Sequence, residues 1–359
     1  MDGKAIVLTN GLLDHYKAKT AHGLIRGTER YEIVGIIDHK HAGKDAGEVL
    51  DGKKRNIPVY ASIENFTDES PVKADFLIVG IATKGGVLPD DMKPFIKSGI
   101  KSGLSIVSGL HEFLTENRDL VELAEVYNVD LIDVRKPKHN KELHFWTGKI
   151  AEVACPKIPV IGTDCNMGKR TTSRFIKEAV SAVGLNAHMI YTGQTGWMQG
   201  GKYGFIFDST LNDFISGEIE HAIYECYKNE SPDVIFIEGQ SSLQNPTGPC
   251  GSEFLISADA DAVILQHAPT RVHFHGTEGY KRKMPTLEQE IALIEMYGVK
   301  TMAVTVNAEN MTLEEARQYQ KEKQEALGIP VILPLEDGVE VLAKCISDLV
   351  TSFEHPFKK

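Results

Sequence analysis

A lysine and its neighbours near the middle of the chain form the pattern with the clearest chemistry. The stretch VIGTDCNMGKRTTS, residues 160–173, passes from an apolar run through a loop ending in Gly-Lys into a helical pattern. A loop that binds phosphate needs converging backbone N–H groups, glycine at close approaches and a lysine. The residue after the lysine is Arg170, where phosphate loops that bind magnesium normally carry Ser or Thr. The sequence therefore predicts a loop better suited to binding phosphate than to hydrolysing ATP. It consists of Gly162, Thr163, Asp164, Cys165, Asn166, Met167, Gly168, Lys169, Arg170 and Thr171.

Two carboxylates beside this loop could hold a magnesium ion, if one is used. Glu238 ends the apolar run of DVIFIEGQSS, residues 233–242, where phosphate-loop proteins place the acid that orients magnesium. Asp164 lies within the loop itself. Thr171 is an imperfect substitute for the usual hydroxyl, because it points about 100° further round the helix. If magnesium is used, we therefore expect Asp164 and Glu238 as its ligands. The alternative is that Glu238 is a solvated carboxylate with no ligand role.

Three other groups of polar residues follow apolar runs, and in open parallel sheets ligands bind where the strands end. The segment YTGQTGWMQGG, residues 191–201, is rich in glycine. It is expected to contact substrate through Gly193, Gln194, Thr195 and Gly196. The segment QHAPTRVHFHG, residues 266–276, offers Arg271 and His273 as contacts for a carboxylate or phosphate, or a histidine as general base. Asn307, at the end of a late strand, is a candidate contact for an adenine edge.

Short apolar strands alternate with helical patterns over most of the chain, which is typical of parallel sheets covered on both faces. Strands are expected at 4–10, 31–38, 75–80, 104–109 and 129–134, and then at 158–162, 187–191, 233–239, 261–267 and 301–307. A basic segment at 135–157 with two prolines is interpreted as the connection between the halves. The sequence predicts an α/β protein, with a Rossmann-like domain at 1–150 and a P-loop NTPase-like parallel-sheet domain at 151–359.

The first half has one feature of a dinucleotide site and lacks another. Asp38 ends the second strand, where such folds bind a ribose, but Gly11 alone follows the first strand in place of a glycine fingerprint. A Rossmann-like structural or substrate-binding domain is therefore favoured over an NAD-dependent dehydrogenase.

Composition narrows the possible partners. The 359 residues carry a formal net charge of −11, which argues against a non-specific nucleic-acid binder. The five cysteines are scattered and form no C-x-x-C pair, which fits a reducing cytosol. No uninterrupted apolar stretch approaches the ~18 residues of a membrane span. We expect a cytoplasmic homo-oligomer that acts on a small molecule, without nucleic-acid or membrane partners.

Several stretches from both halves, taken in order, resemble a family first known as a domain of unknown function and since assigned as D-glutamate (D-amino-acid) N-acetyltransferases. The matching stretches are IVSGLHEFL (106–114), DVRKP (133–137), GTDCNMGKRTT (162–172), TGQTG (192–196), DFISG (213–217), IEGQSSL (237–243), LQHAPTRVH (265–273) and MPTLEQEI (284–291). The resemblance implies that acetyl-CoA donates an acetyl group to the amino group of D-glutamate or a related D-amino acid. It also implies that the phosphate loop holds the coenzyme phosphates without hydrolysing them.

The same resemblance implies roles for individual residues. Direct transfer needs an unprotonated amine, a base and hydrogen-bond donors for the thioester carbonyl oxygen. Backbone amides of the 193–196 loop are the candidate donors. Arg271 is expected to bind the acidic substrate, with Lys202 as the second choice. The candidate bases are Glu238, His267 and His273.

Two functions of other kinds are kept open. The pattern G-T-D-x-x-x-G-K also resembles dethiobiotin synthetase and its relatives, which implies an ATP- and Mg²⁺-dependent synthetase or ligase. Arg170 weakens that alternative. A non-catalytic nucleotide sensor is the other, and it would bind nucleotide tightly without turnover.

Overall fold

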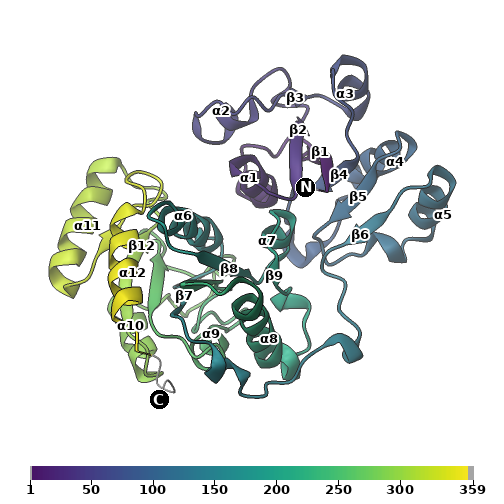
Figure 1. Ribbon diagram of the computed structural model, residues 1–359. Coiled ribbons are helices and arrows are strands. Elements are labelled where there is room, and N and C mark those ends of the chain that lie inside the picture. The colour runs from purple at the N-terminus through teal and green to yellow at the C-terminus, as the bar shows by residue number, and fades with distance from the viewer. Residues whose placement is uncertain (1, 355–359) are drawn as a thin grey trace. The chain divides into compact units, whose positions relative to one another are not determined.

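The computed structural model describes residues 2–354, which form two compact units. One unit holds the chain up to Lys138 together with Gln194–Gly201, and the other holds His139–Gly193 and the chain from Lys202 onward. Each unit contains its own sheet, as Figure 1 shows. The boundary expected from the sequence lies after residue 150. The predicted α/β class with two parallel sheets is confirmed.

The first unit is a six-stranded sheet with the order β3-β2-β1-β4-β5-β6 and parallel pairing throughout. From β1 the strands are added first toward one edge of the sheet, through β2 to β3, and then toward the other edge, from β4 to β6. This order is that of the doubly wound Rossmann fold. Its strands are β1 (Gly3–Leu8), β2 (Tyr31–Ile37), β3 (Val59–Tyr60), β4 (Phe76–Val79), β5 (Ser105–Ser108) and β6 (Leu131–Asp133). Its helices are α1 (Lys19–Arg26), α2 (Ala46–Asp51), α3 (Ile63–Glu69), α4 (Lys93–Lys101), α5 (Arg118–Tyr127) and α7 (Gln194–Met198).

Apolar side chains cover both faces of this sheet. One core joins the strands to α3, α4 and α5, and the other joins them to α1, α2 and α7. Asp38, which follows β2, makes hydrogen bonds to other residues of the same unit. Asp38 accepts hydrogen bonds from Thr9 Oγ1 (2.6 Å), Gly11 N (2.9 Å) and Leu13 N (3.0 Å), and its Oδ1 lies 2.9 Å from His41 Nδ1. Asp38 therefore fixes the turn after β1, the position where a dinucleotide-binding fold would carry its glycine fingerprint.

The second unit is a seven-stranded sheet with the order β13-β12-β11-β7-β10-β8-β9, again parallel throughout. Its strands are β7 (Lys157–Gly162), β8 (Ala187–Tyr191), β9 (Tyr203–Gly204), β10 (Val234–Glu238), β11 (Val263–His267), β12 (Thr301–Val306) and β13 (Val331–Ile332). Its helices are α6 (Lys169–Ala182), α8 (Asn212–Glu230), α9 (Ser252–Ile256), α10 (Leu287–Met296), α11 (Leu313–Leu327) and α12 (Glu340–Ser352).

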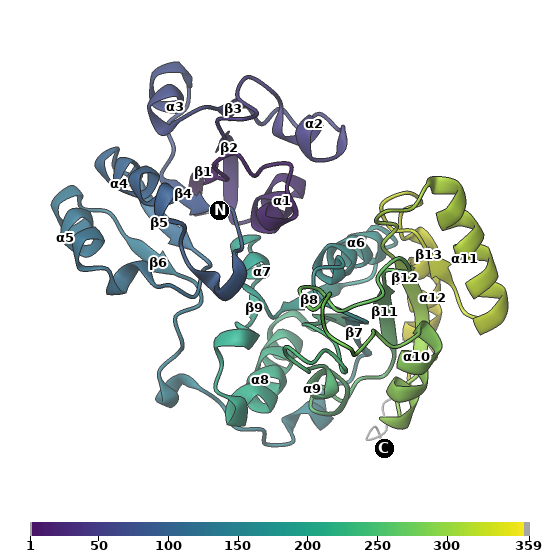
Figure 2. The same ribbon diagram turned by 180° about the vertical axis from the view of Figure 1, so that it is seen from behind.

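The strand that leads into the phosphate loop lies at the centre of this second sheet. All six residues of β7 are buried, because α6 and α12 pack on one face and α8 to α11 on the other. Both views show these helices on either side of the sheet (Figure 1, Figure 2). The parallel register sets Glu238 of β10 beside Val160 and Gln266 of β11 beside Gly162. Three chain segments therefore leave the sheet at one edge, next to the loop.

Within residues 2–354, no helix is both long enough and apolar enough to cross a membrane.

Candidate functional site: the phosphate loop and its surroundings

The loop after β7 turns sharply before α6 begins. Asn166 and Gly168 have positive φ angles of 52° and 104°, and a Cβ on Gly162 would lie 3.0 Å from Met167 Sδ. Lys169, the first residue of α6, is buried and its Nζ donates to the backbone oxygens of Asp164 (2.7 Å) and Ser241 (2.8 Å). Burial lowers the pKa of Lys169. The loop thus wraps around a buried lysine at a helix N-terminus, which is an arrangement that favours anions.

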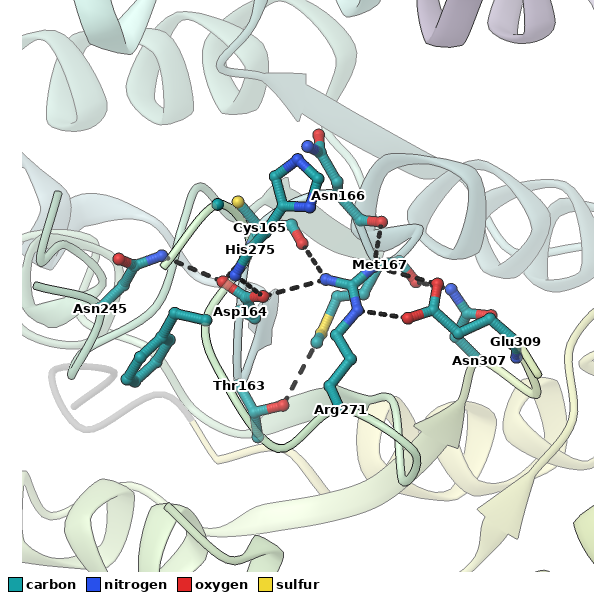
Figure 3. Close-up of polar contacts among 12 residues, drawn as sticks. Thr163, Asp164, Cys165, Asn166, Met167, Asn245, Arg271, His275, Asn307 and Glu309 are labelled. Atoms are coloured by element: carbon teal, nitrogen blue, oxygen red, sulfur yellow. Dashed lines mark hydrogen bonds and ion pairs between the residues drawn. The ribbon is translucent and has the colours of Figure 1, made fainter. Parts of the chain in front are cut away.

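Asp164 is the centre of the polar contacts in the loop. Its side chain is fully buried, and each of its two oxygens accepts two hydrogen bonds. Oδ1 accepts from Cys165 N (2.7 Å) and Asn245 Nδ2 (3.0 Å), while Oδ2 accepts from Arg271 Nη1 (3.0 Å) and His275 N (2.8 Å). Figure 3 shows this convergence. A carboxylate has about four acceptor sites, so Asp164 is saturated by the protein.

Arg271, in the segment after β11, reaches the loop through its guanidinium. Nη1 donates to Asp164 and to Cys165 O (2.7 Å), and Nη2 donates to Asn166 O (3.0 Å). Nε and Nη2 also donate to the two carboxylate oxygens of Glu309. A guanidinium has five N–H donors, and here all five meet protein acceptors. The carboxylate contact predicted for Arg271 would therefore require one of these bonds to be exchanged for the substrate.

Asn307 contacts the same loop but by a different route from the one expected. Its Nδ2 donates to Met167 O (3.3 Å) and its Oδ1 accepts from Glu309 N (3.0 Å). In the arrangement described, the amide proposed to bind adenine holds the far end of the phosphate loop. In the first turn of α6, Thr172 Oγ1 donates to Gln266 Oε1 (2.6 Å), and Arg170 and Thr171 lie between it and Lys169.

The candidate bases lie in three different surroundings. Glu238, 4% exposed, ends β10 and accepts from Thr192 N through Oε2 (3.2 Å). His267, at the end of β11, has Nδ1 3.0 Å from Thr163 Oγ1, and burial lowers its pKa to about 4. His273 is half-buried on the segment after β11, and its Nδ1 is a buried atom without a hydrogen-bond partner among the described residues.

The predicted substrate loop is divided between the two units. Gly193 belongs to the second, where a Cβ on it would lie 3.6 Å from Glu238 Oε1. Gln194, Thr195 and Gly196 begin α7 and are packed in the first unit, where Thr195 Oγ1 lies 3.3 Å from Thr20 Oγ1. They are buried and form part of that unit's packing. Lys202, the second choice for binding a carboxylate, pairs at the surface with Glu230.

Several residues of the site were not anticipated from the sequence. Asn245 binds Asp164 from the turn-rich segment between β10 and α9, and Glu309 binds Arg271 from the segment after β12. Glu290 of α10 is fully buried and accepts from Gln244 Nε2 (2.9 Å). Burial raises the pKa of Glu290 to about 7. The turn-rich composition around Asn245 is a sequence signal, whereas no local pattern marks Glu309 or Glu290.

Metal ligation is limited by these contacts. Among residues 2–354 there is no group of three or more His, Cys, Asp and Glu side chains placed to hold a metal ion. Asp164, one of the two expected ligands, has both oxygens engaged by protein donors. The residues beside the loop therefore do not fit a magnesium ion in this arrangement.

Two family models match the chain, one in each half. A model described as a domain of unknown function, DUF1611_C, P-loop domain, matches residues 144–343, and one described as DUF1611_N, Rossmann-like domain, matches residues 39–137. A solved structure of a DUF1611 family protein from Anabaena variabilis is similar with a TM-score of 0.87 and 27% identity, and the match covers 96% of this chain and 99% of that one. The predicted Rossmann-like and P-loop halves are confirmed.

Two relatives carry a functional name. A protein named D-glutamate N-acetyltransferase from a Pseudoalteromonas species is 31% identical over 272 residues, which are 74% of this chain and 80% of the relative. A protein of the same name from Tritonibacter scottomollicae is 29% identical over 281 residues, 76% of this chain and 81% of the relative. The family resemblance seen in the sequence is confirmed by these matches.

Proposed function

We propose that this chain, which belongs to the DUF1611 family, is an acyltransferase that moves an acetyl group from acetyl-CoA to the amino group of D-glutamate or a related D-amino acid. The observation that carries the proposal is the similarity to two proteins named D-glutamate N-acetyltransferase over 74% and 76% of this chain. The phosphate loop supplies a second, physical argument.

The loop fits the phosphates of a coenzyme better than it fits a nucleotide bound through magnesium. The side chain of Lys169 is buried and donates to two backbone oxygens, so a phosphate oxygen can take the place of one of them and pair with the ammonium group. The N-terminus of α6 adds its dipole at the same point. Because Asp164 is saturated, we assign no step to a metal. Bound acetyl-CoA would supply the acetyl thioester.

In the proposed reaction the amine nitrogen bonds to the acetyl carbon and the C–S bond of the thioester breaks. The substrate ammonium gives up two protons: one goes to a base before attack, and the other ends on the thiol of released coenzyme A. We assign the first proton to Glu238, since its carboxylate lies beside Gly193, where a Cβ would be 3.6 Å from Glu238 Oε1 and 3.3 Å from Gln240 Nε2. His267 is the weaker candidate, because its Nδ1 lies 3.0 Å from Thr163 Oγ1 and burial disfavours the protonated ring that proton transfer would form.

The test is acetyl-CoA-dependent thiol release by the purified protein, with D-glutamate, L-glutamate and a panel of D-amino acids. Lys169→Ala is measured in parallel, with Lys177→Ala in the same helix as the matched control. Release with D-glutamate that is lost in Lys169→Ala and kept in Lys177→Ala supports the proposal. If no amine gives release with the wild-type protein, the proposed function is wrong.

The same samples, given ATP and Mg²⁺, address the two alternatives. ADP formation dependent on a carboxylate or amine substrate would favour a synthetase or ligase resembling dethiobiotin synthetase. Tight nucleotide binding without turnover would favour a nucleotide sensor.

A further inference from the structure

We infer that Glu309 is a positioning residue for the phosphate loop, acting through Arg271. Arg271 donates to the loop and the Glu309 carboxylate accepts from Arg271, so the effect of this carboxylate on the loop passes through the guanidinium. Figure 3 shows Arg271 between Asp164 on one side and Glu309 on the other. The inference concerns the shape of the loop in the ligand-free protein. It rests on the proposed function only where a coenzyme is named below.

The donors of Arg271 are divided between the two sides. Three N–H groups reach the loop, at Asp164 Oδ2 (3.0 Å), Cys165 O (2.7 Å) and Asn166 O (3.0 Å). The other two, on Nε and Nη2, meet the two oxygens of Glu309 as a bidentate pair. Bidentate pairing fixes the plane of a guanidinium, so the pair with Glu309 determines the direction in which the remaining donors point.

Burial makes this arrangement hard to replace by water. The side chain of Arg271 is 13% exposed and that of Asp164 is fully buried, whereas Glu309 is 30% exposed. Without the Glu309 carboxylate, two N–H donors of a largely buried cation would lose their acceptors. The guanidinium would then turn toward other acceptors and release part of its hold on the backbone of the loop.

Glu309 is itself fixed from two sides. Its backbone N donates to Asn307 Oδ1 (3.0 Å), and its backbone O accepts from Thr270 Oγ1 (2.8 Å). Asn307 also donates to Met167 O (3.3 Å). The segment after β12 therefore contacts residues 164–167 by two routes, one through Arg271 and one through Asn307, and these hold the loop in shape before a phosphate arrives.

This role differs from the substrate contact expected of Arg271 from its type and position. Measurements on the ligand-free protein distinguish the two roles. Substituting a residue that shapes the loop changes the loop without substrate, whereas substituting a residue that only binds the substrate carboxylate does not. The decisive variants are Glu309→Gln, which keeps the size but removes the charge, and Arg271→Lys, which keeps the charge but removes the fork. Glu314→Gln is the matched control, since Glu314 is an exposed acid in the first turn of α11.

The experiment is amide hydrogen exchange of the ligand-free proteins, read on peptides covering residues 163–169. We expect exchange about tenfold faster in Glu309→Gln and faster still in Arg271→Lys, because charge-assisted hydrogen bonds are lost, with Glu314→Gln unchanged. Peptides from β10 and β12 report whether each variant remains folded. Unchanged exchange at 163–169 in a folded Glu309→Gln protein would overturn the inference, whatever the result for Arg271→Lys.

A second readout tests the consequence for coenzyme binding. Coenzyme A affinity, measured by calorimetry, should fall about five- to tenfold in Glu309→Gln, because the loop must be ordered on binding. The KM for acetyl-CoA should rise by a similar factor while kcat at saturation stays within twofold. If loop exchange is faster in Glu309→Gln but the wild-type protein transfers no acetyl group, the positioning role stands and the proposed function is wrong. A lower kcat with unchanged KM would contradict positioning of a coenzyme-binding loop.

Discussion

Asp164 and Arg271 form a buried ion pair, with Oδ2 3.0 Å from Nη1, in which both side chains have their full hydrogen-bonding capacity met by the protein. In many phosphate loops the acid near the lysine serves a metal. Here the acid and an arginine from the segment after β11 hold the loop itself. Lys169, whose side chain donates to backbone oxygens, supplies a charge that can meet a phosphate.

Replacing Asp164 by asparagine should destabilise the second unit strongly. The Nδ2 group of the amide would take the place of one carboxylate oxygen. At the Oδ2 position it would face Arg271 Nη1 and His275 N. At the Oδ1 position it would face Cys165 N and Asn245 Nδ2. Breaking a buried ion pair in this way costs about 3 kcal/mol or more. Differential scanning calorimetry measures the change, with Asp213→Asn as the control, because Asp213 is an exposed acid at the start of α8. Equal unfolding temperatures in the two variants would contradict the role given to Asp164.

Glu290 should make stability fall as the pH rises. Burial raises its pKa from 4.5 to about 7, so the folded state holds the proton more tightly than the unfolded state. This contribution is complete below about pH 4.5 and is lost as the pH rises through 7, by roughly 3 kcal/mol. Glu290→Gln removes the titration and keeps a partner for Gln244. Urea unfolding should find the variant more stable than wild type at pH 8, with a difference that shrinks toward pH 5.

His267 should have the opposite effect on stability. Burial lowers its pKa from 6.5 to about 4, so the unfolded state binds the proton more readily. The contribution is complete above about pH 6.5 and is lost as the pH falls through 4, by roughly 3 kcal/mol. In His267→Asn a neutral amide meets Thr163 Oγ1, and the dependence between pH 6.5 and 4 should flatten. A parallel pH dependence in wild type and variant, followed by urea unfolding, would show that His267 titrates normally.

The phosphate loop could be recognised from the sequence because its parts are contiguous. The apolar residues of β7, the loop glycines and the start of α6 follow one another, and their order carries the structural meaning. The strand-terminal position of Glu238 was predicted in the same way, from a run of apolar residues. The strands β3, β9 and β13 were not predicted, because two residues each are too few to show a period.

The partners of the loop depend on contacts between distant positions and could not be read locally. Glu309 lies 38 positions from Arg271, and nothing in either segment indicates that they pair. The segment at 194–198 has the glycine-rich composition of a ligand loop, yet Thr195 packs beside Thr20, 175 positions away. Composition alone is compatible with ligand contact and with core packing, and the packing contact with Thr20 depends on a position far away in the sequence.

The last prediction concerns the base. Glu238→Gln keeps the acceptor for Thr192 N and loses the ability to take a proton, so kcat of acetyl transfer should fall by about 10²- to 10⁴-fold. The KM for acetyl-CoA should stay within a few-fold, because the loop at 162–169 is unchanged. His273→Gln is the comparison, since His273 is the other candidate with an available ring nitrogen. If His273→Gln loses kcat while Glu238→Gln keeps it, the proton goes to the histidine.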